Sequence, residues 1–332
     1  VRALAVGAVG ISSLAVAGVS EQVAAEPVPG FEEPQLVDDL EMAPIDGMWQ
    51  DDSPVVVGEY VFLFEETEFD VPDSTRLWEY HVPTGALRQV DLSEFATVST
   101  PGVAYFTELV FAAQRDLGGG NTEPVLVKLT PGGVPAVVKV LPIQAEDLAA
   151  GSAAVYFSAN SDALWESDLT DPGTVELATG LSRITDITPT PRGDGTEILY
   201  FQADGPNGQE PYRYDPGVGV TEFDIATGSA DSGPEGFHTV FDAAYFRARD
   251  AAGVRSLYRL AGTDATLVTP ELLQADVDQV IGSGTRIFTA FDNGAGGTEL
   301  AYYDDTADTL VTVVADFPFV TDGFSFGPSG AL

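Results

Sequence analysis

The sequence predicts an all-β fold, a β-propeller of four-stranded antiparallel blades with six full blades and a composite seventh. Three observations carry this prediction. One aromatic-centred pattern occurs six times, short apolar runs alternate with polar residues between turn signals, and no segment has the period of a helix. A unit that recurs every 40 to 50 residues or so cannot bury its apolar face alone, so it must pack against its neighbours.

Each copy of the pattern is centred on a phenylalanine. The six centres are Phe62, Phe111, Phe157, Phe201, Phe246 and Phe288. Successive centres lie 49, 46, 44, 45 and 42 residues apart. One ring at a fixed place in every repeat is what packing between blades requires, and we prefer this role to sugar stacking at an open mouth.

Each repeat divides into four strands, of which the stretch before the anchor and the anchor run are the first two. The next run spans 76–80, 123–129, 163–167, 210–214, 256–260 and 299–303 in the six repeats. Turns rich in Gly, Pro and Asp follow at 83–86, 131–133, 171–173, 215–219, 261–264 and 304–308. A last run, such as 310–317, closes the unit. These tight turns favour antiparallel meanders over the parallel coils of a β-solenoid, which is the alternative fold.

The two ends of the repeat region carry partial repeats. The segment 36–40 resembles a last run without its first half, and 319–326 resembles a first half without its second. Together they predict a seventh blade that closes the ring.

One segment carries a family resemblance. The sequence ALWESDLTDPGT at 163–174, preceded by VYFSA, resembles the ELWxxDGT repeat, a hyalin-like propeller repeat of secreted bacterial proteins. The residues that fall on the motif are Leu164, Trp165, Asp168, Thr170, Gly173 and Thr174, whereas Ala163 replaces its Glu and Leu169 its Gly. Weaker copies keep Leu77 and Trp78 in the first repeat, Glu210 and Asp215 in the fourth, and Glu299, Leu300, Asp304 and Thr306 in the last. Over residues 36–326 the resemblance implies a propeller with surface or extracellular placement, and it implies no defined activity.

The N-terminal region predicts export. An uncharged stretch rich in Ala, Val and Gly follows Arg2, and Val23-Ala24-Ala25 offers small residues before Glu26. We expect a signal peptide at 1–25, with an uncleaved anchor as the alternative, then an acidic Pro-rich linker at 26–35 and the propeller at 36–332. The predicted location is secreted or cell-surface.

Charge and composition exclude several classes of partner. The formal net charge is −38, Lys128 and Lys139 are the only lysines, and there is no cysteine. Such a surface repels phosphate backbones and anionic lipids, so we expect neither nucleic acid nor, after signal cleavage, a membrane as partner. Disulfides, thiolate metal sites and a Cys nucleophile are excluded. We expect a monomer, and a requirement for high salt is a further hypothesis.

Two acidic, Gly-rich loops are candidate calcium sites. The first, 204–210, offers Asp204, Asn207 and Glu210, and the second, 292–299, offers Asp292, Asn293 and Glu299. Their oxygen atoms suit Ca²⁺, which is the only cofactor that the sequence suggests, but neither loop has EF-hand spacing. Acidic Gly turns are also ordinary hairpin tips.

Other motifs carry little information. The elbow-like Gly323-Phe324-Ser325-Phe326-Gly327 has no room after it for an Asp and a His partner. The two histidines, His81 and His238, share no metal-ligand spacing. Arg192-Gly193-Asp194 spells an adhesion tripeptide at an expected hairpin tip, and Asp194 and Glu197 suit turn chemistry.

No catalytic constellation stands out, so the leading hypothesis is a non-enzymatic binding or scaffold module whose loops on one face meet a protein or polysaccharide. The alternative is a carbohydrate-active hydrolase or lyase with a carboxylate site at the propeller mouth. Acidic and basic groups from several blades converging on the axis with perturbed pKa values would favour the enzyme.

Overall fold

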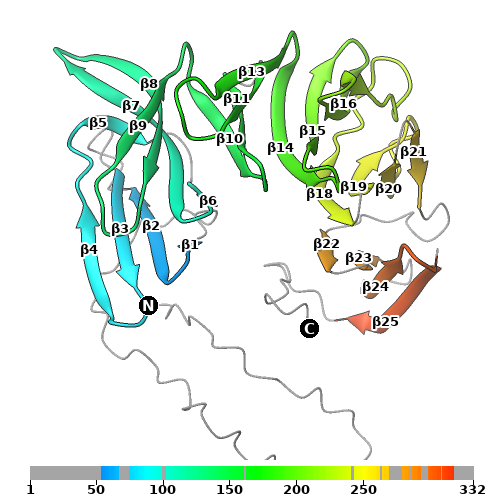
Figure 1. The fold of residues 1–332 in the computed structure, drawn as a ribbon. Coiled ribbons are helices and arrows are strands. Elements are labelled where there is room, and N and C mark those ends of the chain that lie inside the picture. The colour runs from blue at the N-terminus through cyan, green and yellow to red at the C-terminus, as the bar shows by residue number, and fades with distance from the viewer. Residues whose placement is uncertain are drawn as a thin grey trace, which may run out of the picture.

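The computed structural model describes residues 54–66, 75–98, 102–160, 162–240, 243–261, 264–268, 279–283, 286–292, 298–307 and 309–317. These residues form six antiparallel sheets, one per predicted repeat, which we call the first to the sixth blade. Figure 1 shows the six sheets following one another around a central space. The predicted all-β propeller architecture of four-stranded blades is confirmed, and the described residues contain no helix.

The strands follow the chain in order within each blade. The first blade has β1 (Val55–Val57), β2 (Tyr60–Glu66), β3 (Thr75–His81) and β4 (Ala86–Val90); the second has β5 (Phe95–Val98), β6 (Val103–Tyr105), β7 (Glu108–Gly118), β8 (Asn121–Leu129) and β9 (Ala136–Val140). The third has β10 (Ala145–Ala150), β11 (Val155–Ala159), β12 (Ala163–Ser167) and β13 (Thr174–Thr179); the fourth has β14 (Ser182–Pro191), β15 (Glu197–Gly205), β16 (Gly208–Asp215) and β17 (Gly219–Glu222). The fifth has β18 (Glu235–Val240), β19 (Ala243–Arg249), β20 (Arg255–Ala261) and β21 (Asp264–Leu267); the sixth has β22 (Gln279–Ser283), β23 (Arg286–Asp292), β24 (Thr298–Asp304) and β25 (Thr309–Phe317).

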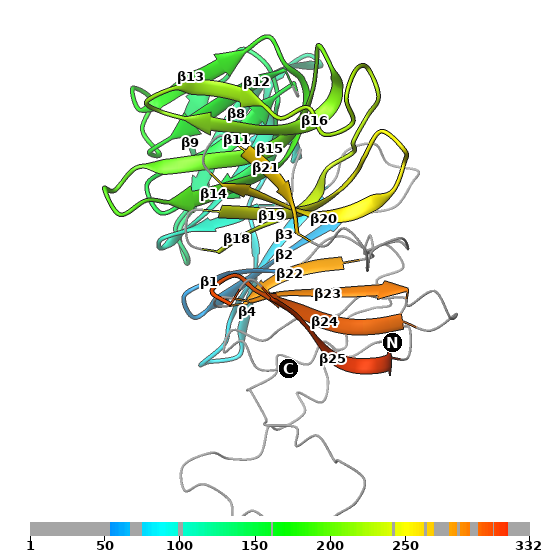
Figure 2. The same ribbon diagram turned by 90° about the vertical axis from the view of Figure 1, so that its right-hand side faces the viewer.

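The first strand lies innermost in five blades, and in the second blade β6 takes this place. Figure 1 shows β1, β6, β10, β14, β18 and β22 around the central space, and each of them contacts the next one along the chain. Figure 2, from the side, shows β22, β23, β24 and β25 side by side in chain order. The second blade differs from the prediction because its inner edge is made of two short strands, β5 and β6, that pair with different parts of β7.

Five of the six aromatic anchors pack between blades as the sequence predicts, and four of the five pack against the blade before their own. Phe157 pairs across the sheet with Trp165 and packs against the second blade, where Val110 and Leu126 are buried. Phe111, Phe201 and Phe246 each pack in the same way against the blade before their own. Their rings are fully buried, which explains why the period of the repeat is marked by phenylalanine.

The two end blades depart from the predicted register by one residue. Phe62 pairs with Glu79 and packs forward against the second blade, so Leu63, opposite Trp78, occupies the place that the anchor has elsewhere. In the sixth blade Thr289 takes this place, opposite Ala301. Phe288 therefore lies on the face that turns away from the fifth blade. The spacing of the phenylalanines therefore did not identify the equivalent residue, which is Leu63 in the first blade and Thr289 in the sixth.

The predicted signal peptide, the linker and both halves of the composite seventh blade, 36–40 and 319–326, lie outside the described residues. So does the elbow-like segment at 323–327.

Candidate functional site

The two loops predicted to hold calcium are hairpin ends. Asp204 and Glu210 lie in β15 and β16, with Asn207 in the turn between them. Asp292 ends β23 and Glu299 lies in β24, whereas Asn293 is outside the described residues. Within the part of the chain that the structure describes, no three His, Asp or Glu side chains are grouped so that they could hold a metal ion. Calcium binding by the predicted sets stays a prediction.

Glu210 has a structural task. Its side chain is fully buried and accepts hydrogen bonds from the backbone N–H groups of Ile225 (3.0 Å) and Ala226 (3.2 Å) and from the Ser232 hydroxyl (2.7 Å). These donors belong to the long connection between the fourth and fifth blades. Burial raises the pKa of Glu210, and the three hydrogen bonds partly offset this rise. The carboxylate holds the connection against the start of β16.

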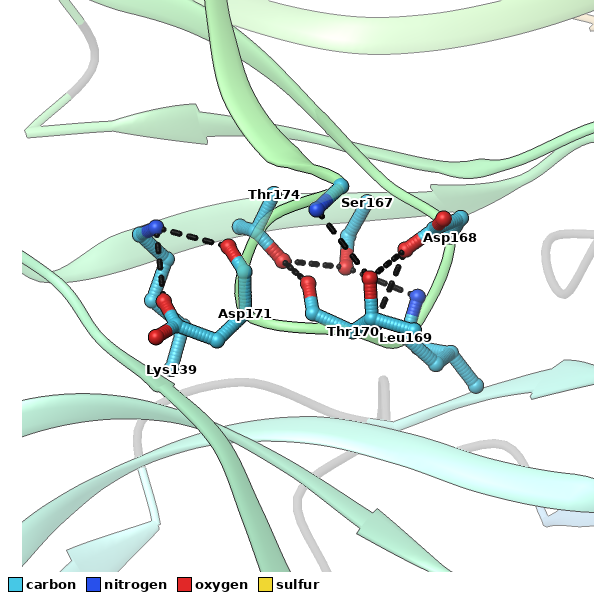
Figure 3. Close-up of polar contacts among 8 residues, drawn as sticks. Lys139, Ser167, Asp168, Leu169, Thr170, Asp171 and Thr174 are labelled. Carbon is cyan, nitrogen blue, oxygen red and sulfur yellow. Dashed lines mark hydrogen bonds and ion pairs between the residues drawn. The ribbon is translucent and has the colours of Figure 1, made fainter.

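The loop that carries the best motif match is closed by its own side chains (Figure 3). Asp168 Oδ1 accepts from the N–H (2.9 Å) and the hydroxyl (2.6 Å) of Thr170. The Ser167 and Thr174 hydroxyls lie 2.7 Å apart, and Thr174 Oγ1 also donates to the Thr170 carbonyl at 2.7 Å. Leu169, at the motif's Gly position, has φ 64°, a conformation that favours glycine and explains the consensus residue. The motif therefore encodes a turn.

Both lysines of the chain reach this loop from the second blade. Lys139 Nζ donates to the carbonyl and the carboxylate of Asp171, each at 2.8 Å, as Figure 3 shows. Lys128 Nζ donates to the Leu169 carbonyl at 3.4 Å. The two cations therefore join the second and third blades.

The same kind of contact joins two other blade pairs. In the first blade, Arg88 binds Glu79 at 2.7 Å and donates to the Gly133 carbonyl of the second blade at 2.9 Å. Burial opposes ionisation of Glu79, but hydrogen bonds from Arg88 and Gly132 outweigh it and lower the pKa of this carboxyl. In the fifth blade, Arg259 binds Asp305 of the sixth at 3.0 Å. The scarce basic residues are thus used to hold the turn of the following blade.

A second repeated contact lies on the inner strands. Asp147 Oδ2 in the third blade accepts from the Ile187 N–H of the fourth at 3.0 Å. Asp186 Oδ2 in the fourth accepts from the Gly236 (2.7 Å) and Phe237 (3.3 Å) N–H groups of the fifth. Asp147, Asp186 and Gly236 have φ values of 44°, 57° and 68° at corresponding places. Successive N–H groups beside a left-handed residue form a concave anion site, and each carboxylate fills the site of the next blade.

These inner carboxylates have raised pKa values. Burial raises the pKa of Asp147 to about 6, and the charge of Asp186 adds to the effect. Burial also raises the pKa of Asp186, which the Gly236 and Phe237 N–H groups and the nearby His238 partly offset. The groups are bonded to the backbone of the next blade, so their first role is to join blades.

We call one end of the propeller the turn face. This end carries the hairpins at 106–107, 151–154 and 192–196 and the turn at 168–173. Its inner rim is firmly tied. Glu197, only 3% exposed, accepts from Ser152 N–H (2.6 Å), Ala153 N–H (3.1 Å) and the Tyr156 hydroxyl (2.9 Å) of the preceding blade. The prediction of turn chemistry for Glu197 is therefore replaced by a contact between blades. The Tyr105 hydroxyl donates to the Ala153 carbonyl at 2.7 Å.

Phe106 stands out on this rim. Its side chain is 75% exposed although its backbone has φ 51°, which is costly for a bulky residue. Its ring packs edge-on against Tyr105, with centroids 4.5 Å apart. Val134 and Val218, in turns of the second and fourth blades on the same face, are 77% and 75% exposed. An aromatic side chain displayed on a tied hairpin is a candidate contact for a partner.

A cavity lies at the opposite end of the molecule, where the first blade meets the second. It has a volume of about 540 Å³ and is lined by residues that include Arg76, Gln89, Asp91, Ser93, Phe95 and Thr97. Its size suits a small ligand, and its lining offers both charges, hydroxyls and one aromatic ring.

The histidines and the adhesion tripeptide have local partners. His81 stacks on Tyr60 at 4.5 Å and shares a 2.7 Å hydrogen bond with Thr84 Oγ1. His238 lies near Asp186. Arg192 binds Asp215 with both guanidinium nitrogens, at 3.2 and 2.7 Å, and Asp194 accepts from Thr196, as expected of a turn. The arginine of the tripeptide is therefore engaged within the fourth blade.

Sequence reasoning missed Phe106 and the two inner carboxylates. Asp147 lies 10 residues before its anchor and Asp186 lies 15 before its own, so no fixed spacing marks them. Phe106 follows Tyr105 in an otherwise ordinary apolar run, and its left-handed backbone leaves no trace in the residue types.

No protein-family model and no curated protein matches the sequence. A solved prolyl endopeptidase is 12% identical with a TM-score of 0.51, and the alignment covers 80% of this chain and 42% of that one. The chain thus spans less than half the length of that enzyme. A putative 6-phosphogluconolactonase from Bacteroides fragilis is 14% identical with a TM-score of 0.47, over 84% of this chain and 88% of that one.

At 12% identity the likeness to the prolyl endopeptidase shows the β-propeller fold alone. Among the described residues, no helix has the length and apolar character needed to cross a bilayer.

Proposed function

We propose that this chain is a secreted or cell-surface β-propeller that acts as a binding or scaffold module for a protein or polysaccharide and carries out no reaction of its own. The observation that carries the proposal is Phe106. Its side chain is 75% exposed on the turn face, and its backbone has a left-handed conformation that is unfavourable for a bulky residue. Strain that persists at an exposed position is typical of recognition sites.

The surroundings of Phe106 support this role. The Tyr105 hydroxyl ties the base of the hairpin to the third blade, and Glu197 ties that blade to the fourth. The ring is therefore presented on a rigid support, so binding loses little conformational entropy. The exposed Val134 and Val218 extend the apolar contact on the same face.

The test compares Phe106→Ser with Leu117→Ser. Leu117 is 56% exposed and lies near the far end of β7, the strand that Phe106 precedes, so it is a matched control from the same blade. Both variants and the wild type are applied to a polysaccharide array and to immobilised cell-surface material, with and without Ca²⁺. We expect at least a tenfold loss of binding for Phe106→Ser and none for Leu117→Ser. Equal binding by all three proteins would contradict the proposal.

Pretreatment of the surface material identifies the partner. Binding that protease abolishes indicates a protein, and binding that periodate abolishes indicates a polysaccharide.

One observation favours the alternative of a carbohydrate-active hydrolase or lyase. Asp147 lies on an inner strand with its pKa raised to about 6, a value suited to proton transfer near neutral pH. Turnover of a glycoside or uronate substrate that Asp147→Asn abolishes would establish this activity. Turnover that survives the substitution would assign it to another site.

A further inference from the structure

Negative charge lies beside the exposed Phe106. Burial first, and then the charges of Glu197 and Asp168, raise the pKa of Tyr105, the residue on which the Phe106 ring packs. Asp168 belongs to the turn of the third blade, and its side chain is exposed. Its carboxylate is therefore close to the base of the hairpin that displays Phe106.

The exposed carboxylates on this face are held in the ionised form. The Thr170 hydroxyl and N–H donate to Asp168 and lower the pKa of its carboxyl. Asp194, exposed on the hairpin of the fourth blade, has its pKa lowered in the same way by the hydroxyl and N–H of Thr196. The turn face therefore keeps both negative charges at and below neutral pH.

In the second, third and fourth blades, the basic side chains that reach the turn face bond within the protein. Each one donates to a carbonyl or a carboxylate of a turn. They are Lys128, Lys139, Arg192 and Arg213. Cations that are engaged in this way leave the exposed carboxylates to set the charge that a partner meets. The face therefore attracts positive charge, in keeping with the net charge of −38.

We propose that the turn face binds a basic protein segment, which packs an apolar side chain on Phe106 and places Lys or Arg side chains beside Asp168 and Asp194. This inference rests on the proposed binding function and names the partner. The exposed Val134 and Val218 favour a protein over a polysaccharide, because an aliphatic side chain has no flat ring on which a sugar can stack. A lysine or arginine can also lie over the Phe106 ring, whose face attracts cations.

The apolar and the charged contacts have separable effects on binding. An apolar anchor at the centre of an interface mainly slows dissociation. Charges at its rim mainly speed association, and salt screens them. Phe106 should therefore govern the dissociation rate, whereas Asp168 and Asp194 should govern the association rate and its dependence on salt.

The test selects peptides from a phage-displayed random library on the full chain, with Phe106→Ser as the counter-selection. We expect the enriched peptides to combine a net positive charge with at least one apolar residue. One of them is then synthesised, and its binding rates are measured by surface plasmon resonance at low and at high salt. The association rate with the wild type should fall about tenfold at high salt.

The charge variants are Asp168→Asn and Asp194→Asn. An asparagine keeps the side-chain oxygen that accepts from Thr170 or Thr196, so the turns retain their hydrogen bonds. Each variant should lower the association rate about twofold at low salt and leave it unchanged at high salt.

Asp116→Asn is the matched control. Asp116 is exposed at the opposite end of the propeller, where its Oδ1 accepts from the Gly118 N–H at 2.7 Å, so the change removes the same charge from a similar turn. It should leave both rates unchanged. Equal losses in Asp116→Asn and Asp168→Asn would overturn the inference, because the peptide would then be adsorbed by the acidic surface as a whole.

The outcome also separates this inference from the proposed function. Neutral or acidic peptides that require Phe106, or periodate-sensitive binding to surface material that requires it, would overturn the basic partner and leave the binding module standing. Selection that yields no peptide dependent on Phe106 would contradict both.

Discussion

Asp147 accepts a hydrogen bond from the N–H of the residue that follows Asp186, so two carboxylates of raised pKa are neighbours on adjacent inner strands. Asp186 in turn accepts from the fifth blade. This series of contacts between inner strands ends at the fifth blade, because Gly236 has no side chain that could accept a hydrogen bond from the next blade. Each carboxylate is paired with backbone dipoles and with no cation in the hydrogen bonds described, which is why burial raises the pKa.

This relationship predicts a pH effect at Asp147. The folded-state pKa of about 6 is above the value of about 3.9 in an unfolded chain. The protonated form is therefore favoured by folding, and the stability it contributes is present below about pH 4 and is lost as the pH rises through about 6. Asp147→Asn should remove this loss, so that the variant gains on the wild type by about 2 kcal/mol between pH 4 and pH 7. Urea unfolding at the two pH values measures the gain, and a constant difference would contradict the assignment.

At Asp215 we expect stability to depend on pH in the opposite direction. Hydrogen bonds from Arg213 first, and then Gly217 and Arg192, outweigh burial and lower its pKa to about 2. The stability that this carboxylate contributes is present above about pH 4 and is lost as the pH falls through about 2. Asp215→Asn should cost about 2 kcal/mol at pH 7 and nearly nothing at pH 2, in the same urea measurement. Glu176→Gln, which removes an exposed acid from β13 of the third blade, serves as the control at both pH values.

At Glu197 we expect that removing a single contact between blades causes a large loss of stability. It is buried and accepts from two backbone N–H groups, the Ser152 hydroxyl and the Tyr156 hydroxyl. Glu197→Ala leaves these donors unpaired and should lower the free energy of unfolding by about 3 kcal/mol. Glu197→Gln retains one acceptor and should lose less. If both variants lose under 1 kcal/mol, the donors have found water instead.

Much of the fold follows from the sequence for a simple reason. A ring at a fixed place between blades must be large and apolar, and turns must be built from Gly, Pro and Asp, so Phe157 and the turn at 171–173 reveal themselves by residue type. The end blades are harder because their anchors face different surroundings. Phe62 and Phe288 have the residue type of the other anchors, but the strand register at these positions differs by one residue. A shift of one residue places the side chain on the opposite face of the strand.

The contacts of the candidate site do not follow from residue type. With 52 acidic residues in the chain, nothing in the sequence separates Glu197, which accepts hydrogen bonds from the preceding blade, from acids that face solvent. Glu210 was predicted as a ligand because it ends a Gly-rich turn. The structure gives it three donors from a connection between blades, the first of them 15 residues later in the chain, and only the folded chain brings them together.

In the loop that matches the family motif, we expect the hydrogen bonds within the turn to contribute more stability than the contacts from the lysines that reach it. Thr170 donates to Asp168 and its hydroxyl accepts from the Gly173 N–H at 3.1 Å, so Thr170→Val removes two contacts inside the turn. This variant should lose about 1–2 kcal/mol of stability and should expose the Gly173 amide to faster hydrogen exchange. Lys139→Met removes an ion pair whose carboxylate is 73% exposed, and such pairs contribute about 0–1 kcal/mol. It should leave exchange at Gly173 unchanged at low and at high salt. A faster Gly173 amide in Lys139→Met would mean that the second blade, rather than the turn sequence, holds the loop in shape.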